Sequence, residues 1–139
     1  MNLNFFKHAR KCSLEADYTG YNQTKVGCVI TYHGTILAKG HNSDMTHSLQ
    51  EYFNCRYRPK NVGMRYLPSK THAEVSALAK IRYLDIDFSK VELYTYRELR
   101  DGKIAKSRPC EACMAAIKKM GIKKIYYTTE DGYAKETPI

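Results

Sequence analysis

The sequence predicts an α/β domain in which helices cover a mixed sheet. Four runs rich in β-branched and aromatic residues, at 26–32, 35–40, 91–96 and 122–128, are typical of strands. A helical run at 110–120 separates the last two strands, and a strand–helix–strand unit of this kind forms a right-handed parallel crossover. The first two strands are joined by a tight turn and therefore pair antiparallel. The predicted sheet thus contains both kinds of pairing.

Length and composition predict one domain over residues 1–139. The chain is 43% hydrophobic and 27% charged, which is the composition of an ordinary soluble protein. No run approaches the ~18 apolar residues of a membrane span. The charged residues that begin at Lys7 argue against a secretion signal. The five cysteines are therefore expected to be reduced and the protein cytoplasmic.

Residues 3–17 predict the first helix. Apolar residues recur there at helical spacing and share one face, and Thr19-Gly20 follows as a termination signal. The residues of this face are Phe5, Ala9, Cys12 and Ala16. Cys12 is expected to pack in the core, and an alternative is that it shares a metal with His8, one helical turn earlier.

The hairpin that follows turns at His33-Gly34, and Asn42 comes directly after its second strand. The segment at 43–70 has one short helical run, at 49–58, and is otherwise a loop. Its second half interleaves basic and aromatic residues, which suits a nucleotide or a single nucleic-acid strand; a solvated loop is the alternative. The 23 basic and 14 acidic residues give a net charge of +9. This charge also favours a phosphorylated or polyanionic partner over a merely basic surface.

The second half of the chain continues the pattern. Apolar residues at helical spacing predict a helix over 71–81, with Thr71-x-x-Glu74 as a capping box at its start. Gly121 ends the next helix. Asp131-Gly132 can turn a short fifth strand back against the fourth.

Two cysteines at the start of one helix carry the chemistry. Cys110 and Cys113 follow Pro109, and residues three apart share a helix face, so both thiols point the same way. Alone they are either half of a zinc site or a thioredoxin-type redox pair. His72 supplies a third ligand and leaves the fourth zinc position open for water, as in catalytic sites. Glu74 then lies two residues from a ligand, within reach of that water.

These residues resemble the signature of the zinc-dependent cytidine/deoxycytidylate deaminase superfamily, His-x-Glu followed by Pro-Cys-x-x-Cys. The motifs are His72-Ala73-Glu74 and Pro109-Cys110-Glu111-Ala112-Cys113, and the similarity to the nucleotide and tRNA deaminase branches covers residues 3–128. The resemblance implies a three-layer α/β/α sandwich with a mixed sheet of four to five strands. It also implies a homo-oligomer.

The same resemblance implies the roles of the site residues. His72, Cys110 and Cys113 bind Zn²⁺, and zinc-bound hydroxide attacks C4 of cytosine while Glu74 shuttles protons. Substrate-binding roles fall on Ala73, Arg108 and Asn42. The main chain of Ala73 and Arg108 is expected to hold the base edge and the departing amine. Asn42 is expected to bind the sugar, with a turn-forming role as the alternative.

Three features depart from the superfamily pattern. Residues 98–107 form an insert where many relatives have a short connection, and it is expected to cover the pocket or a subunit interface. Few residues follow Cys113, so the last helix and strand of the nucleic-acid branches are not expected. A second zinc on His47 and Cys55 is a further alternative.

Four functions are compatible with the sequence. The leading prediction is a hydrolytic deaminase of a free pyrimidine nucleotide, dCMP or CMP. The first alternative is a cytosine or adenine deaminase of single-stranded DNA or RNA, and the second is a nucleoside or free-base deaminase. The last is a zinc fold that only binds nucleic acid, which the presence of Glu74 disfavours.

Overall fold

The structure is a computed structural model that describes residues 2–16, 25–43, 47–57 and 71–138. Its elements in chain order are α1 (Leu3–Ser13), β1 (Lys25–Tyr32), β2 (Thr35–His41), α2 (Ser48–Tyr57), α3 (Ala73–Ile81), the 3₁₀ turn η1 (Phe88–Lys90), β3 (Val91–Glu98), α4 (Glu111–Met120), β4 (Lys124–Thr129) and β5 (Gly132–Glu136). In the described part of the chain, no helix has the length and apolar character needed to cross a membrane.

The strands form one five-stranded sheet in the order β2-β1-β3-β4-β5. β3 and β4 are parallel and are joined through α4, whereas every other neighbouring pair is antiparallel. The mixed sheet, its parallel crossover and its fifth strand are therefore confirmed. Asp131 and Gly132 lie at the turn into that last strand.

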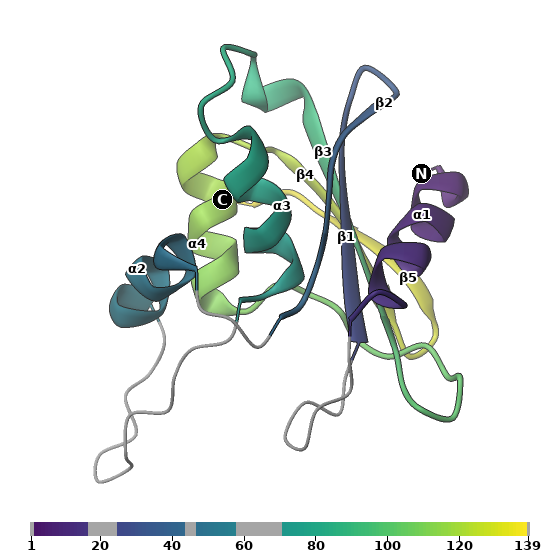
Figure 1. The fold of residues 1–139 in the computed structure, drawn as a ribbon. Helices are drawn as coiled ribbons and strands as arrows, with labels where there is room; N and C mark the ends of the chain where they lie inside the picture. The colour runs from purple at the N-terminus through teal and green to yellow at the C-terminus, as the bar shows by residue number, and fades with distance from the viewer. Residues whose placement is uncertain (1, 17–24, 44–46, 58–70, 139) are drawn as a thin grey trace, which may run out of the picture.

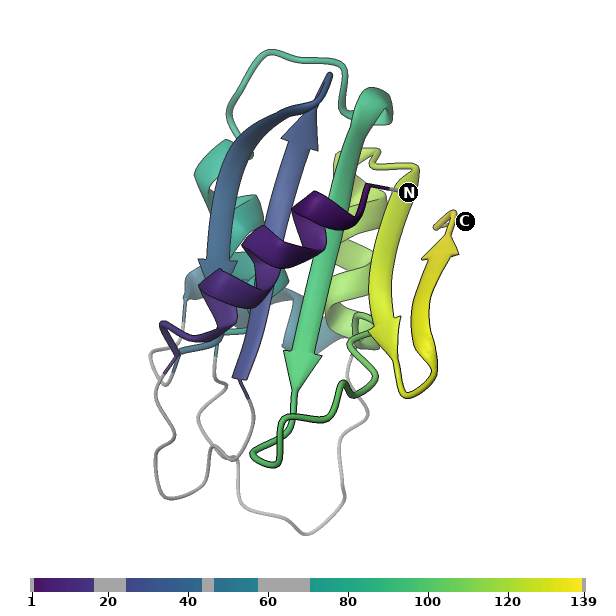
Figure 2. The ribbon, with the colours of Figure 1, turned by 90° about the vertical axis from the view of Figure 1, so that its right-hand side faces the viewer.

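Helices cover both faces of the sheet and make three layers. Figure 1 shows the sheet nearly edge-on, with α1 on one side and α2, α3 and α4 on the other. Figure 2 shows α1 crossing the front of the sheet while α3 and α4 lie behind it. The predicted α/β/α sandwich is confirmed.

Two glycines let helices approach the sheet closely. At Gly27 in β1, an added Cβ would overlap the carbonyl oxygen of Ala9 in α1. At Gly40 in β2, it would lie 2.6 Å from the carbonyl oxygen of Ala73 and 2.7 Å from the backbone nitrogen of Ala77. Since real Cβ atoms avoid such distances, Gly40 fixes how near the start of α3 lies to the sheet.

The main core lies between the sheet and α3 and α4, and a smaller one lies under α1. Leu78 and Ile81 of α3 and Ile117 of α4 pack there against Ile30 and Leu93 of the sheet, all of them buried. Such burial gives roughly 1.5–3 kcal/mol for each large aliphatic side chain. The core therefore holds the two helices that carry the signature residues.

Two local predictions differ from the structure. The first helix ends at Ser13, earlier than expected, and Phe6 rather than Phe5 is its buried aromatic residue. The other residues of the predicted face are buried as expected, and Phe6 packs against Tyr94 of β3 and Tyr133 of β5. The predicted stop at Thr19-Gly20 lies outside the described residues.

The predicted capping box is also wrong. α3 begins at Ala73, so its N-cap is His72, and no side chain caps it. The hydroxyl of Thr71 instead accepts a hydrogen bond of 2.8 Å from the backbone N–H of His47. Glu74 is thus released from a capping role, because the helix starts one residue later than the motif requires.

Candidate active site

The candidate site forms where the first turns of α3 and α4 meet. His72 is the N-cap of α3 and Cys110 is the N-cap of α4; both have extended backbones, and neither side chain caps its helix. The ring nitrogen Nδ1 of His72 lies 3.5 Å from Sγ of Cys110 and 3.2 Å from Sγ of Cys113. The N-cap positions, which usually carry Ser, Thr, Asp or Asn, are thus occupied by His72 and Cys110, whose metal-binding atoms face each other.

This donor set fits a zinc ion. Zinc–sulfur bonds of ~2.3 Å and zinc–nitrogen bonds of ~2.1 Å in a tetrahedron put nitrogen and sulfur about 3.6 Å apart, close to the separations here. All three donor atoms lie within 4.8 Å of one another. One imidazole and two thiols leave a fourth position for a non-protein ligand, which is the arrangement of a catalytic zinc site.

In the described part of the chain, His72, Cys110 and Cys113 are the one such group of three or more potential ligands. The alternative pairs, His8 with Cys12 and His47 with Cys55, belong to no such group in the described residues. Cys12 is buried in the core under α1. Nδ1 of His47 accepts a hydrogen bond of 3.0 Å from the backbone of Leu49.

The two cysteines differ in their tendency to lose a proton. The hydrogen bond from Cys113 lowers the pKa of Cys110 to about 3, with His72 acting in the same direction against the effect of burial. Donating that bond, together with burial, raises the pKa of Cys113 well above its usual value. Cys110 therefore favours the thiolate, which is the form that binds metal. Neither cysteine forms a disulfide.

Glu74 is buried beside this group. It is the second residue of α3, and only 5% of its surface is exposed. Burial raises the pKa of its carboxyl, while the neighbouring His72 opposes the shift. A buried carboxyl next to three metal donors lies where a proton acceptor is needed for water activation.

A cavity of about 320 Å³ opens at this group. Its lining residues are Val26, Asn42, Thr71, His72, Ala73, Glu74, Arg97, Lys106, Ser107, Arg108 and Cys110. Every residue that the sequence predicts for catalysis or substrate binding lines it, as do two of the three predicted ligands. Arg97, Lys106 and Ser107 were not predicted. The signal that could have found Arg97 is strand alternation, since neighbouring residues of β3 point to opposite faces.

Comparison with known proteins agrees with this chemistry. The sequence profile of the cytidine and deoxycytidylate deaminase zinc-binding region matches residues 2–129. The chain belongs to this family of zinc-dependent hydrolytic deaminases. A search of curated proteins finds no significant match.

Solved structures of dCMP and cytidine deaminases have a fold similar to that of this deaminase. The dCMP deaminase of cyanophage S-TIM5 in apo form has a TM-score of 0.58 at 24% identity, covering 91% of this chain and 80% of that one. The same phage enzyme with dCMP and dUMP gives 0.57 at 24% identity, covering 91% and 79%. The cytidine deaminase of Burkholderia pseudomallei gives 0.65 at 15% identity, covering 99% and 93%.

Asn42 also holds the sheet of this deaminase together at the pocket. Its side-chain oxygen accepts a hydrogen bond of 2.9 Å from the backbone N–H of Val26, and its own backbone N–H donates to the carbonyl of Val26 at 3.2 Å. The residue therefore joins the end of β2 to the start of β1. This structural role differs from the turn-forming alternative, because the partner lies 16 residues away in the sequence. The residue also lines the cavity.

The side chain of Arg108 is engaged by the last strand. Its guanidinium makes a two-pronged ion pair with Glu136 of β5, with nitrogen–oxygen distances of 3.0 and 2.9 Å. Bidentate pairs of this kind fix geometry as well as charge. The segment that precedes Cys110 is therefore tied to β5.

Three buried hydroxyls hold the end of the insert. Oγ of Ser107 donates to the carbonyl of Thr95 at 3.1 Å and accepts from the backbone N–H of Thr128 at 2.8 Å. The hydroxyl of Thr128 in turn donates to the carbonyl of Ala105 at 2.7 Å. Ser107 thus joins β3 and β4 directly before the cysteine motif. Lys106 and Ser107 at the end of the insert line the cavity, which agrees with one of the two positions expected for the insert.

Proposed function

We propose that this deaminase hydrolyses cytosine in a free pyrimidine nucleotide, converting dCMP or CMP to dUMP or UMP and ammonia. The observation that carries the proposal is one cavity that joins Glu74 and the metal donors to a wall bearing Arg97 and Lys106. A nucleotide needs both features, a hydrolytic centre for the base and cations for the phosphate. The similar structure of the S-TIM5 enzyme with dCMP and dUMP also supports it.

In this proposal His72, Cys110 and Cys113 hold one zinc ion. Bound zinc supplies Lewis acidity, which brings the pKa of a water ligand toward neutrality. The protein's part is to keep one thiolate ready at Cys110 and to present all three donors from the starts of two helices packed on one core.

Glu74 moves the protons. Its carboxylate accepts a proton from the attacking water as the bond between oxygen and C4 forms, and passes it to the ring nitrogen N3. It then delivers the second proton of that water to the amino group, and the bond between C4 and nitrogen breaks to release ammonia. Burial beside the metal donors keeps the carboxyl away from bulk solvent during these transfers.

Asn42, Ala73 and Arg108 orient the substrate. Because the guanidinium of Arg108 is paired with Glu136, the proposed contact of this residue with the departing amine falls on its main chain. The main chain of Ala73 faces the base edge, and the side-chain amide of Asn42 binds the sugar. All three residues line the cavity.

A substrate panel tests the proposal. The zinc-loaded protein is incubated with dCMP, CMP, deoxycytidine, cytosine and a cytosine-bearing single-stranded oligonucleotide, and ammonia release is followed. We expect the nucleotides to be the fastest substrates. Turnover of the oligonucleotide without turnover of dCMP or CMP would replace the proposal with the nucleic-acid alternative. Turnover of deoxycytidine or cytosine alone would replace it with the nucleoside or free-base alternative.

A further inference from the structure

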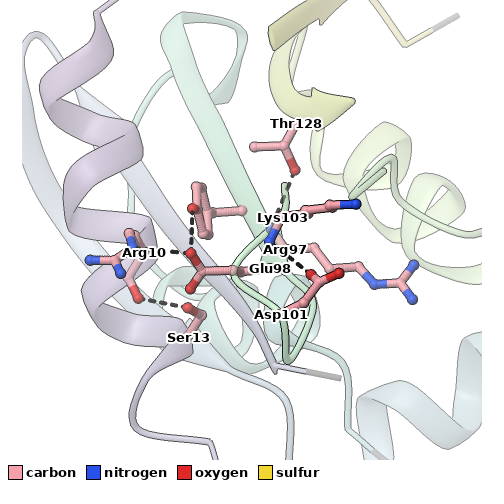
Figure 3. Close-up of polar contacts among 8 residues, drawn as sticks. Arg10, Ser13, Arg97, Glu98, Asp101, Lys103 and Thr128 are labelled. Atoms are coloured by element: carbon pink, nitrogen blue, oxygen red, sulfur yellow. Dashed lines mark hydrogen bonds and ion pairs between the residues drawn. The ribbon is translucent and has the colours of Figure 1, made fainter. Parts of the chain in front are cut away.

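Arg97 brings a positive charge into the cavity from the end of β3. The next residue, Glu98, lies on the opposite face of the strand, where its carboxylate is 3.6 Å from Nε of Arg10 in α1. Figure 3 shows the Arg97 side chain extending away from Glu98 and Arg10. Its backbone is fixed by a hydrogen bond of 3.3 Å from its N–H to the hydroxyl of Thr128. The direction of Arg97 therefore follows from strand alternation in a firmly held strand.

The guanidinium of Arg97 has unused hydrogen-bonding capacity. Nη1 donates to the backbone carbonyl of Lys106 at 3.3 Å. Nε is buried and has no hydrogen-bond partner in the described part of the chain. A buried donor without a partner is uncommon in folded proteins and calls for an explanation. The carbonyl of Lys106 orients the guanidinium but cannot neutralise its charge.

The charges of the cavity leave Arg97 and Lys106 as its candidate anion binders. Arg108 is neutralised by Glu136. Glu74 is the one carboxylate among the lining residues. The sequence of the segments outside the described residues holds two acidic residues, Asp17 and Asp44, and none between positions 58 and 70. The cavity thus has an excess of positive charge on the wall formed by β3 and the insert.

A phosphate group fits this wall. A guanidinium presents parallel N–H donors that match two phosphate oxygens, and the ammonium of Lys106 adds a second charge. A nucleotide with its base at Glu74 carries a phosphate on the far side of the sugar, whereas a nucleoside carries only a hydroxyl there.

We propose that Arg97 binds the 5′-phosphate of the substrate and thereby makes this deaminase selective for nucleotides over nucleosides. The inference rests on the proposed function and deepens it by naming the residue that determines specificity. Lys106, from the insert, assists by holding the guanidinium through its carbonyl. The same phosphate chemistry occurs in a free nucleotide and in a polynucleotide, so the test includes both sources.

The first test measures binding without turnover. Isothermal titration of the zinc-loaded protein with dUMP and with deoxyuridine gives the affinity that the phosphate contributes. We expect Arg97→Gln to weaken dUMP binding about 10- to 100-fold, the loss typical of a charged hydrogen-bonding partner. Deoxyuridine binding should stay within about twofold. Arg97→Lys keeps the charge but loses the paired N–H donors of the guanidinium. Its affinity for dUMP should lie between those of the wild type and Arg97→Gln.

A matched control separates recognition from general charge and from folding. Arg100→Gln removes the same charge three residues further along the chain, in the insert, and Arg100 does not line the cavity. This variant should bind dUMP like the wild type. An equal loss of dUMP and deoxyuridine affinity in Arg97→Gln would show a structural role and overturn the proposal. So would an equal loss of dUMP affinity in both variants.

The second test compares kcat/KM of the Arg97→Gln variant for dCMP, deoxycytidine and a single-stranded oligonucleotide. We expect a loss for dCMP with little change for deoxycytidine. Wild-type protein that binds dUMP more tightly than deoxyuridine but releases no ammonia would refute the proposed function and leave the phosphate site standing. Loss confined to the oligonucleotide would assign Arg97 to backbone phosphates and overturn the nucleotide proposal.

Discussion

At the scale of single residues, the site depends on polar side chains that are buried in the folded protein. Glu74 is free of the capping role that its sequence context indicates, because α3 starts at Ala73. Ser107 is buried with all its hydrogen-bonding groups engaged. One residue is assigned to the reaction and the other holds the segment that carries Cys110.

Replacing Glu74 by glutamine should abolish proton transfer while keeping the shape of the side chain. We expect deamination of dCMP to fall by about 10²- to 10⁴-fold, the usual contribution of a general acid–base residue. Ammonia release measures the loss, and zinc content measured on the same sample should stay at the wild-type level. Full activity in this variant would remove Glu74 from its assigned role.

Ser107→Ala should destabilise the protein by about 1–3 kcal/mol, because it leaves the buried backbone N–H of Thr128 without an acceptor. Urea denaturation measures the change in the free energy of unfolding. Thr129→Ala is the control, since its hydroxyl accepts only an exposed hydrogen bond from the backbone of Asp131. Equal costs for the two variants would contradict the role given to the hydroxyl cluster.

At the scale of elements, the position of α3 depends on Gly40. A methyl group there would press against Ala73 and Ala77, so Gly40→Ala should cost about 1–3 kcal/mol and displace the start of the helix. Zinc affinity should fall as well, because His72 and Glu74 move with that turn. Gly27→Ala presses against α1 on the opposite face and should destabilise without weakening zinc binding. Competition with a chelator distinguishes the two variants.

The ion pair between Glu136 of β5 and Arg108, next to the cysteine motif, predicts that the free energy of unfolding depends on pH. Arg108 beside Glu136 lowers the pKa of that carboxyl, so the stabilisation is fully present above the unfolded value of about 4.3 and is lost as pH falls through the folded value. Solvent screening limits it to about 0.5–1 kcal/mol. Glu136→Gln should therefore destabilise at pH 7, and its difference from the wild type should be smaller at pH 3. A constant difference between these pH values would contradict the assignment.

At the scale of the whole molecule, local patterns predicted the elements better than they predicted the contacts between distant segments. Strand runs and turn residues identify every strand, because their alternation and glycines are local properties. Arg97 escaped prediction because its role depends on which way β3 faces. Leu93 of that strand packs in the core with α3 and α4, whereas Tyr96 packs under α1. Phe6 was missed for a similar reason, since its burial depends on contacts with distant strands, Tyr94 of β3 and Tyr133 of β5.

The site itself was predictable because its two motifs are each short and chemically specific. Residues that hold the motifs in place were not, since Ser107, Thr128 and Glu136 are ordinary polar residues whose partners lie far along the chain. Homo-oligomerisation stays a prediction.

The central claim is that His72, Cys110 and Cys113 together hold one zinc ion, and metal analysis tests it most directly. Protein purified without added metal is measured for zinc per chain by mass spectrometry, as wild type and as His72→Ala. The three-donor geometry predicts one zinc per wild-type chain and a large loss in the variant. A native wild-type protein without zinc, or a variant that keeps its zinc, would contradict the claim.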